Sequence, residues 1–125
     1  MTWLAIALGG ALGVMGRHAL NAAVHVRYSV TFPWGTFAVN ALGCFVIGLL
    51  AGLLAAARVH IGEFGRAFIF VGILGGFTTF STFGLDTFTL VKSGAAGSAV
   101  ANVVGQVVVG LSAVWVGYEL GSWRG

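Results

Sequence analysis

Four long apolar stretches run through this chain, and each is long enough to cross a bilayer core of about 30 Å, which needs roughly 20 helical residues. Charged residues make up only 7% of the 125 residues and lie mostly between these stretches. A soluble chain of this size needs a charged coat, which this composition does not supply. The sequence therefore predicts an all-α membrane protein with one transmembrane domain over 1–125, its four helices spanning about 2–24, 33–57, 64–91 and 95–121.

The sequence lacks the residues and motifs that several other classes of protein need. A single cysteine, Cys44, excludes an intrachain disulfide framework and a cysteine-based zinc site. The six Lys and Arg residues are scattered, as expected near the ends of membrane spans, so no nucleic-acid partner is predicted. Walker-type phosphate-binding and HExxH zinc motifs are absent, and the three histidines fall towards span ends. The chain is not predicted to be an enzyme.

Glycine pairs spaced four residues apart occur in all four spans. Such small-xxx-small spacing lets two helix backbones meet without side chains between them, so we predict that these glycines pack helices together. The alternative is that they line a pore. The pairs are Gly9/Gly13, Gly48/Gly52, Gly72/Gly76 and Gly117/Gly121.

Basic residues are almost balanced between the two ends of the predicted bundle. The termini and the 58–66 link carry Arg58, Arg66 and Arg124, and the opposite end carries Arg27 and Lys92, with Arg17 lying nearby in the first span. The positive-inside rule needs a clear excess of Lys and Arg to fix an orientation. We therefore predict insertion in both orientations and pairing of opposite copies; the alternative is that misjudged span ends hide a real bias.

The third span contains a segment that is unusual for a membrane helix. Gly75 and Gly76 are followed by β-branched and hydroxyl residues up to Gly84, which favours a break at mid-membrane depth over 75–84. Unwound backbone is tolerated in a membrane where it is buried in protein or lines a watery path, and its freed carbonyls can hold a cation. The alternative is a continuous helix whose hydroxyls bond back to the preceding turn.

Aromatic and amide side chains near this segment are candidates for an anion path. Phe80 and Phe83 lie three residues apart on one helical face, and an aromatic ring edge is electropositive. Asn40 lies in the middle of the second span, and Asn102 and Gln106 share one face of the fourth. The rings either fill space or meet an anion, and the amides either join helices or offer N–H groups to an anion.

These residues carry a resemblance to a known family. The segment 75–83, GGFTTFSTF, closely resembles the broken third helix of the Fluc (CrcB-type) fluoride channels. The segment 35–40, GTFAVN, is similar to their second-helix GTxxVN motif, and 9–13, GGALG, followed by Arg17, is similar to their first-helix start. The resemblance covers nearly the whole chain. It implies an antiparallel, dual-topology homodimer with two paths that passively export cytoplasmic fluoride across a bacterial plasma or inner membrane.

The resemblance also implies which residues form the fluoride path. Asn40 matches the pore asparagine of the family, and Phe80 and Phe83 match its paired pore phenylalanines. The other positions expected near the path are Thr36, Ser81, Thr82, Asn102 and Gln106.

Three further positions match the family outside that path. Gly75 and Thr78 match residues whose backbone carbonyls hold a structural Na+, which is not transported, at the dimer centre. Arg17 resembles the basic residue near the pore vestibule. The chain departs from the family pattern at 84–86, where Ser followed two residues later by Glu is more common, so no role carries over to Asp86.

Two other functions remain open from the residues alone. A dual-topology small multidrug exporter also has four spans, but it needs a membrane-embedded carboxylate, for which Asp86 is the candidate in the apolar segments. A non-transporting assembly subunit would explain the glycines and leave the hydroxyl-rich segment unexplained.

Overall fold

The computed structural model describes residues 1–28 and 31–124, and it is built from four long apolar helical segments. The first, second and fourth are α1 (Thr2–Arg27), α2 (Trp34–Ala55) and α6 (Ala96–Ser122). The third comprises α3 (Glu63–Arg66), the π-helix η1 (Ala67–Leu74), α4 (Gly75–Phe77) and α5 (Phe80–Lys92). Each of the four segments is long and apolar enough to cross a membrane, as the sequence predicted.

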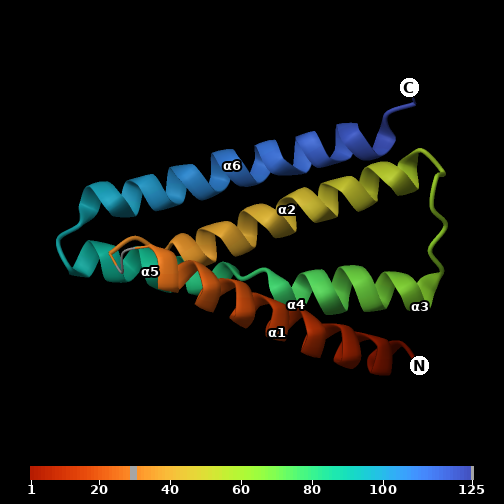
Figure 1. Cartoon of the computed structure of the whole chain (residues 1–125), viewed down its shortest axis with the longest axis horizontal. Helices are drawn as coiled ribbons and strands as arrows, with labels where there is room; N and C mark the ends of the chain where they lie inside the picture. Colours follow the sequence, from red (N-terminus) through yellow and green to blue (C-terminus); the bar gives the residue numbers. More distant parts are fainter. Residues whose placement is uncertain (29–30, 125) are drawn as a thin grey trace.

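Both ends of the bundle are visible in Figure 1. The two termini and the link between α2 and α3 lie at one end, and α2 and α6 begin at the other. Pro33 directly precedes α2, where its missing N–H costs nothing because the first helical amides have no partner within the helix. Gly94, with φ of 84°, makes the tight turn between α5 and α6, a conformation that glycine adopts without strain.

Glycines hold α2 against α6. A Cβ atom on Gly48 would meet the carbonyl oxygen of Val114, and one on Gly117 would meet the backbone of α2 at a distance of 2.8 Å from the Leu49 nitrogen. Gly52 and Gly121 face the partner helix in the same way. The two backbones are therefore in direct contact, which confirms the packing role predicted from the glycine spacing.

A second glycine contact joins α1 to the third segment. A Cβ on Gly72 of η1 would lie 2.9 Å from the Gly9 Cα, and one on Gly76 of α4 would lie 2.8 Å from the Gly10 carbonyl oxygen. Gly13 faces the backbone of Ile73 in the same way. These contacts fix α1 across η1 and α4.

The third segment bends between α4 and α5. Thr78 and Thr79 have extended backbone angles, with ψ of 156° and 117°, while Gly75, Gly76 and all residues from Phe80 to Lys92 are helical. The sequence predicted an interruption over 75–84, and the extended backbone is limited to two residues. The adjacent glycines remain helical because Gly76 packs directly on α1.

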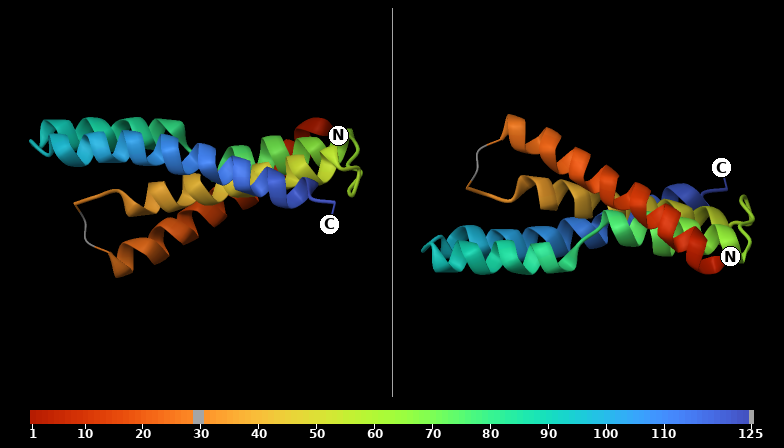
Figure 2. Two further views of the ribbon diagram at one scale, coloured as in Figure 1. Left: turned by 90° about the horizontal axis from the view of Figure 1, so that it is seen from above. Right: turned by 90° about the horizontal axis from the view of Figure 1, so that it is seen from below.

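Beyond this bend the bundle divides. Figure 2 shows that α1 and the start of α2 splay away from α5 and α6 at the end opposite the termini. No contact between α1 and α5 is found among the described residues, whereas α5 packs against α6. Two cavities lie in the opening, lined by α1, α2 and α5.

Candidate functional site

The bend releases two backbone carbonyls from helical hydrogen bonding. In a continuous helix the Thr79 N–H would donate to the Gly75 carbonyl, but here it donates to the Asn40 side-chain oxygen at 2.9 Å. The Thr82 N–H would likewise reach the Thr78 carbonyl, but here it donates to the Thr79 hydroxyl at 3.2 Å. The carbonyls of Gly75 and Thr78 therefore lose the amide partner that a helix would give them.

Opposite partial charges meet at this bend. Helix α4 ends with carbonyls that have no helical amide partner and carry partial negative charge, and α5 begins with amide groups, which carry partial positive charge. The N–H groups of Phe80 and Ser81, at the first two positions of α5, have no acceptor within their own helix. A helix interrupted inside a membrane can therefore attract a cation on one side of the bend and an anion on the other.

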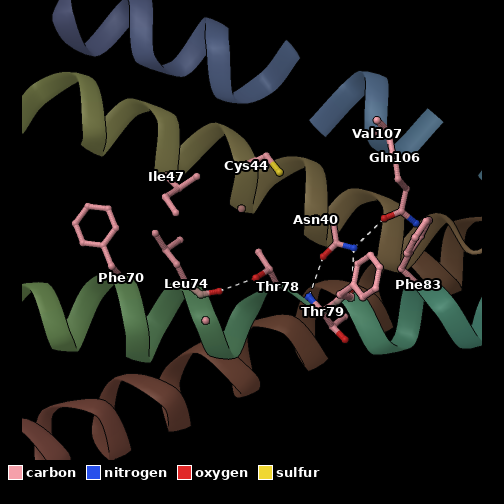
Figure 3. Close-up of a pocket in the computed structure, with 13 residues that line it drawn as sticks. Asn40, Cys44, Ile47, Phe70, Leu74, Thr78, Thr79, Phe83, Gln106 and Val107 are labelled. Carbon is pink, nitrogen blue, oxygen red and sulfur yellow. Dashed lines mark hydrogen bonds between the residues drawn. The ribbon is translucent and has the colours of Figure 1, made fainter. Parts of the chain in front are cut away.

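The side-chain amide of Asn40 closes the bend from α2. Its nitrogen donates to the Thr79 carbonyl at 3.0 Å and to the Gln106 side-chain oxygen at 2.8 Å, while its oxygen accepts the Thr79 N–H (Figure 3). An asparagine side chain has two N–H groups. Both are already used by the protein, so Asn40 has no N–H left for a ligand in this arrangement.

Three further side chains continue this hydrogen-bond chain through α6 to α5. The Gln106 nitrogen donates to the Asn102 oxygen at 2.9 Å, and the Asn102 nitrogen donates to the Thr87 hydroxyl at 3.0 Å. That hydroxyl donates in turn to the Phe83 carbonyl at 2.8 Å. Asn102 is fully buried, with 0% of its surface exposed. The chain from Thr79 to Phe83 therefore holds α2, α5 and α6 in one register.

A pocket of about 400 Å³ opens beside these amides. One wall is apolar and includes Cys44, Ile47, Phe70 and Leu74 (Figure 3). The opposite side combines amide, hydroxyl and aromatic groups. The residues lining the whole pocket that the sequence had singled out are Asn40, Gly75, Thr78, Phe80, Phe83 and Gln106.

The two phenylalanines lie next to each other at this pocket. Their ring centroids are 5.5 Å apart and their planes are tilted by 46°. Phe80 is 83% exposed in the single chain, although it sits within a membrane-spanning segment. Rings held in a tilted arrangement present both edges and faces to their surroundings, and the edges are electropositive.

A second cavity, of about 230 Å³, lies on the other side of Thr79 and collects three of the remaining predicted residues, Arg17, Thr36 and Thr82. Arg17 donates from its guanidinium to the Thr78 carbonyl at 3.5 Å. The third predicted hydroxyl, that of Ser81, is exposed and lies 3.4 Å from the Thr79 hydroxyl.

A third cavity, of about 220 Å³, adjoins the second and shares Asn21, Thr36 and Thr82 with it. Asp86 lines this third cavity, and its Oδ2 atom is buried without a hydrogen-bond partner among the described residues. The carboxylate therefore lies apart from the pocket that contains the phenylalanines.

Sequence reasoning missed two residues that organise the site. Thr79 links Asn40 to α5 through both its backbone and its hydroxyl, and Thr87 ends the chain of amides. Thr79 lies inside the segment 75–84 that the sequence analysis identified, so the many hydroxyl residues of that segment could have pointed to it. Thr87 lies in an ordinary helical position, and no local pattern in the sequence distinguishes it.

Comparisons with known proteins agree with one another. Residues 4–118 match the family model described as CrcB-like protein, Camphor Resistance (CrcB). A protein of Opitutus terrae is 52% identical over 117 residues, covering 93% of this chain and 89% of its own length. A protein of Methylobacillus flagellatus is 49% identical, covering 92% and 90%, and one of Chloroflexus aurantiacus is 46% identical, covering 98% and 96%. All three are named as a fluoride-specific ion channel, FluC.

Proposed function

The chain belongs to the CrcB-like protein family, and from that membership we propose that it is a fluoride-selective ion channel. It lets cytoplasmic fluoride leave the cell passively and so lowers fluoride toxicity. The protein is a multi-pass protein of a bacterial plasma or inner membrane, and it is a channel rather than an enzyme. The observation that carries the proposal most directly is the meeting of opposite helix ends at Thr78 and Thr79, beside a pocket lined by neutral donors.

Fluoride is small and strongly hydrated, so a selective path must replace the hydrogen bonds of water with closely placed donors. Neutral amides, hydroxyls and ring edges do this while holding the ion loosely enough for it to leave, as conduction requires. The pocket beside the bend offers such groups from Phe80, Phe83 and Gln106. The unbonded N–H groups at the start of α5 add a field that favours an anion.

We assign the path to two consecutive regions. The inner region is the pocket beside the bend, with Asn40 holding the Thr79 backbone in place. The outer region is the vestibule, the cavity around Arg17, whose positive charge raises the local concentration of anions. The remaining residues of the path are the hydroxyl residues Thr36, Ser81 and Thr82 and the amide residue Gln106. Asn102, also expected near the path, is fully buried and supports Gln106 from behind.

A second copy of the chain, inserted in the opposite orientation, completes the path. In the single chain, Phe80 is 83% exposed beside an open pocket, and the neighbouring Ser81, with its hydroxyl, is exposed as well. Polar groups facing lipid are costly, so a partner that covers this face stabilises it. The near balance of basic residues between the two ends favours copies of both orientations. We therefore place the break of the third helix at mid-membrane depth and at the centre of an antiparallel homodimer.

The carbonyls of Gly75 and Thr78 fit the structural sodium site that the family resemblance implies. Each has lost its helical amide partner, one to Asn40 and the other to Thr79. Among the described residues the Gly75 oxygen accepts no hydrogen bond, and the Thr78 oxygen accepts only the 3.5 Å one from Arg17, at the negative end of α4. The Arg17 guanidinium already points at the Thr78 carbonyl, which is consistent with a demand for positive charge there. A bound Na+ would supply positive potential between the two paths and join the subunits.

Fluoride export by this chain is tested in bacterial cells that have lost their own fluoride exporter. Expression of the chain is expected to restore growth in medium containing fluoride. Failure to restore growth, with the protein present in the membrane fraction, would contradict the proposed function. An Asn40→Asp variant expressed at the same level serves as the matched negative control.

A further inference from the structure

The N–H groups of the three amides can be counted from their hydrogen bonds. Asn40 uses both of its side-chain N–H groups, on the Thr79 carbonyl and on Gln106. Gln106 uses one, on the Asn102 oxygen at 2.9 Å, and Asn102 uses one, on Thr87. Asn102 is fully buried, whereas Gln106 is only partly buried and lines the pocket with Phe80 and Phe83. One amide N–H is therefore both unused and at the pocket, and it belongs to Gln106.

The direction of the chain of hydrogen bonds is fixed at both ends by backbone groups. At one end, the Thr79 N–H and carbonyl require the Asn40 amide to present its oxygen to the first and its nitrogen to the second. At the other end, Thr87 commits its hydroxyl proton to the Phe83 carbonyl, so its oxygen can only accept from the Asn102 nitrogen. Both ends require the same orientation of Gln106, with its oxygen towards Asn40 and its nitrogen away from it.

We infer that Gln106 supplies the amide N–H that meets the anion in the path, that Asn40 is a positioning residue, and that Thr87 and Asn102 hold Gln106 in its orientation. The inference rests on the proposed function, since it names the donor for the ion that the channel carries. The resemblance to the family assigns the asparagine as the pore amide. In this chain that asparagine is occupied by the protein itself, and the fourth helix provides the free donor.

Thr87 provides a test that leaves the pocket residues unchanged. Thr87→Val keeps the shape of the side chain but removes the oxygen that accepts from the buried Asn102 nitrogen. The Asn102 amide then turns to find another partner, and its oxygen no longer holds the Gln106 nitrogen. Fluoride efflux from liposomes is expected to fall roughly tenfold, as a loss of about 1.4 kcal/mol implies. Thr87→Ser restores the hydroxyl and the rate. Thr2→Val makes the same change at an exposed position at the start of α1, away from the amides and from the three cavities, and is expected to leave the rate unchanged.

A spectroscopic measurement on the unaltered protein tests the donor directly. Fluoride is titrated into ¹⁵N-labelled protein in lipid nanodiscs, and the side-chain amide signals are followed, with those of Gln106 assigned by their loss in Gln106→Glu. We expect fluoride to shift the Gln106 signals more than those of Asn40, and the shift to be lost in Thr87→Val and kept in Thr87→Ser.

The outcomes separate this inference from the proposed function. A fluoride response on Asn40 without one on Gln106, or a Thr87→Val variant that conducts at the unaltered rate, would overturn the assignment of Gln106. Unaltered protein that is folded and releases no fluoride would instead contradict the proposed function itself.

Discussion

Replacing Asn40 with aspartate puts an oxygen where the side chain now presents a nitrogen. That nitrogen donates to the Thr79 carbonyl at 3.0 Å and to the Gln106 oxygen at 2.8 Å, so in the variant both become contacts between acceptors. The Gln106 amide can turn round and donate to the new carboxylate, but its oxygen then faces the Asn102 oxygen and the hydrogen bond between these two side chains is lost in exchange. At least one partly buried acceptor therefore stays unpaired, which costs about 1–3 kcal/mol. We expect Asn40→Asp to lower the free energy of unfolding by about 2–3 kcal/mol and to remain folded.

The effect on flux is expected to be larger than the effect on stability. A carboxylate about 4 Å from an anion in the pocket raises the energy of that anion by about 4 kcal/mol at an effective dielectric constant of 20. At 1.36 kcal/mol per factor of ten, this lowers the occupancy about 1,000-fold. The turned Gln106 amide also uses an N–H on the carboxylate. Fluoride efflux is therefore expected to fall at least about 100-fold.

The assay measures fluoride efflux from liposomes together with thermal unfolding of the same preparation. Cys44→Ser serves as the matched control, because Cys44 lies one turn further along α2, on the apolar wall of the same pocket, and makes no hydrogen bond among the described residues. The control is expected to keep its flux. We expect fluoride efflux to fall at least about 100-fold. A folded Asn40→Asp variant whose efflux stays within about threefold of that of the unaltered protein would refute the reasoning.

Three other perturbations test separate parts of the structure. Phe80→Ile or Phe83→Ile removes a ring that lines the pocket, so fluoride flux should fall severalfold while the size-exclusion profile stays that of the unaltered protein. Unchanged flux would contradict the aromatic contribution. Gly48→Val drives a side chain into the α6 backbone and should lower the free energy of unfolding by about 3 kcal/mol or more. Gly97→Val serves as the control, because its side chain enters open space. Equal stability of the two variants would contradict the contact between α2 and α6. One or two lysines added to the 58–66 link should bias insertion to one orientation and lower activity, and a co-expressed partner of opposite bias should restore it. Full activity of the biased chain alone would contradict antiparallel assembly.

The helical framework follows from simple sequence patterns. Four apolar stretches separated by charges predict four long helices, and the glycine spacing predicts close contacts between them. The spacing does not predict which glycine pairs contact each other. Gly48 and Gly117 lie far apart in the sequence, so their contact depends on how the whole bundle assembles.

The third segment is only partly predictable. The cluster of glycines and hydroxyls marks where the chain bends, but local propensity places the interruption over ten residues, and packing confines it to Thr78 and Thr79. Gly76 is held in a helix by its contact with α1, which local propensity does not include. The π-helix over Ala67–Leu74 has no counterpart in the sequence reasoning, because its apolar residues also suit an ordinary helix.

The candidate site is predictable in its members and less so in their bonding. Asn40 was identified because an amide in the middle of a membrane span needs a partner. Its partners, Thr79 and Gln106, lie 39 and 66 residues away, so the sequence alone does not show that both of its N–H groups are used. The importance of Thr87 likewise emerges only when α5 and α6 are side by side.

Fluoride efflux from liposomes that contain the purified protein, with chloride efflux from the same liposomes as the comparison, tests the central claim most directly. A fluoride electrode is expected to record rapid release of fluoride, while chloride stays inside, because the pocket offers closely spaced neutral donors suited to a small, strongly hydrated anion. Equal release of both anions would contradict a selective path. Folded protein that releases neither would contradict the channel itself and return attention to Asp86 and the exporter hypothesis.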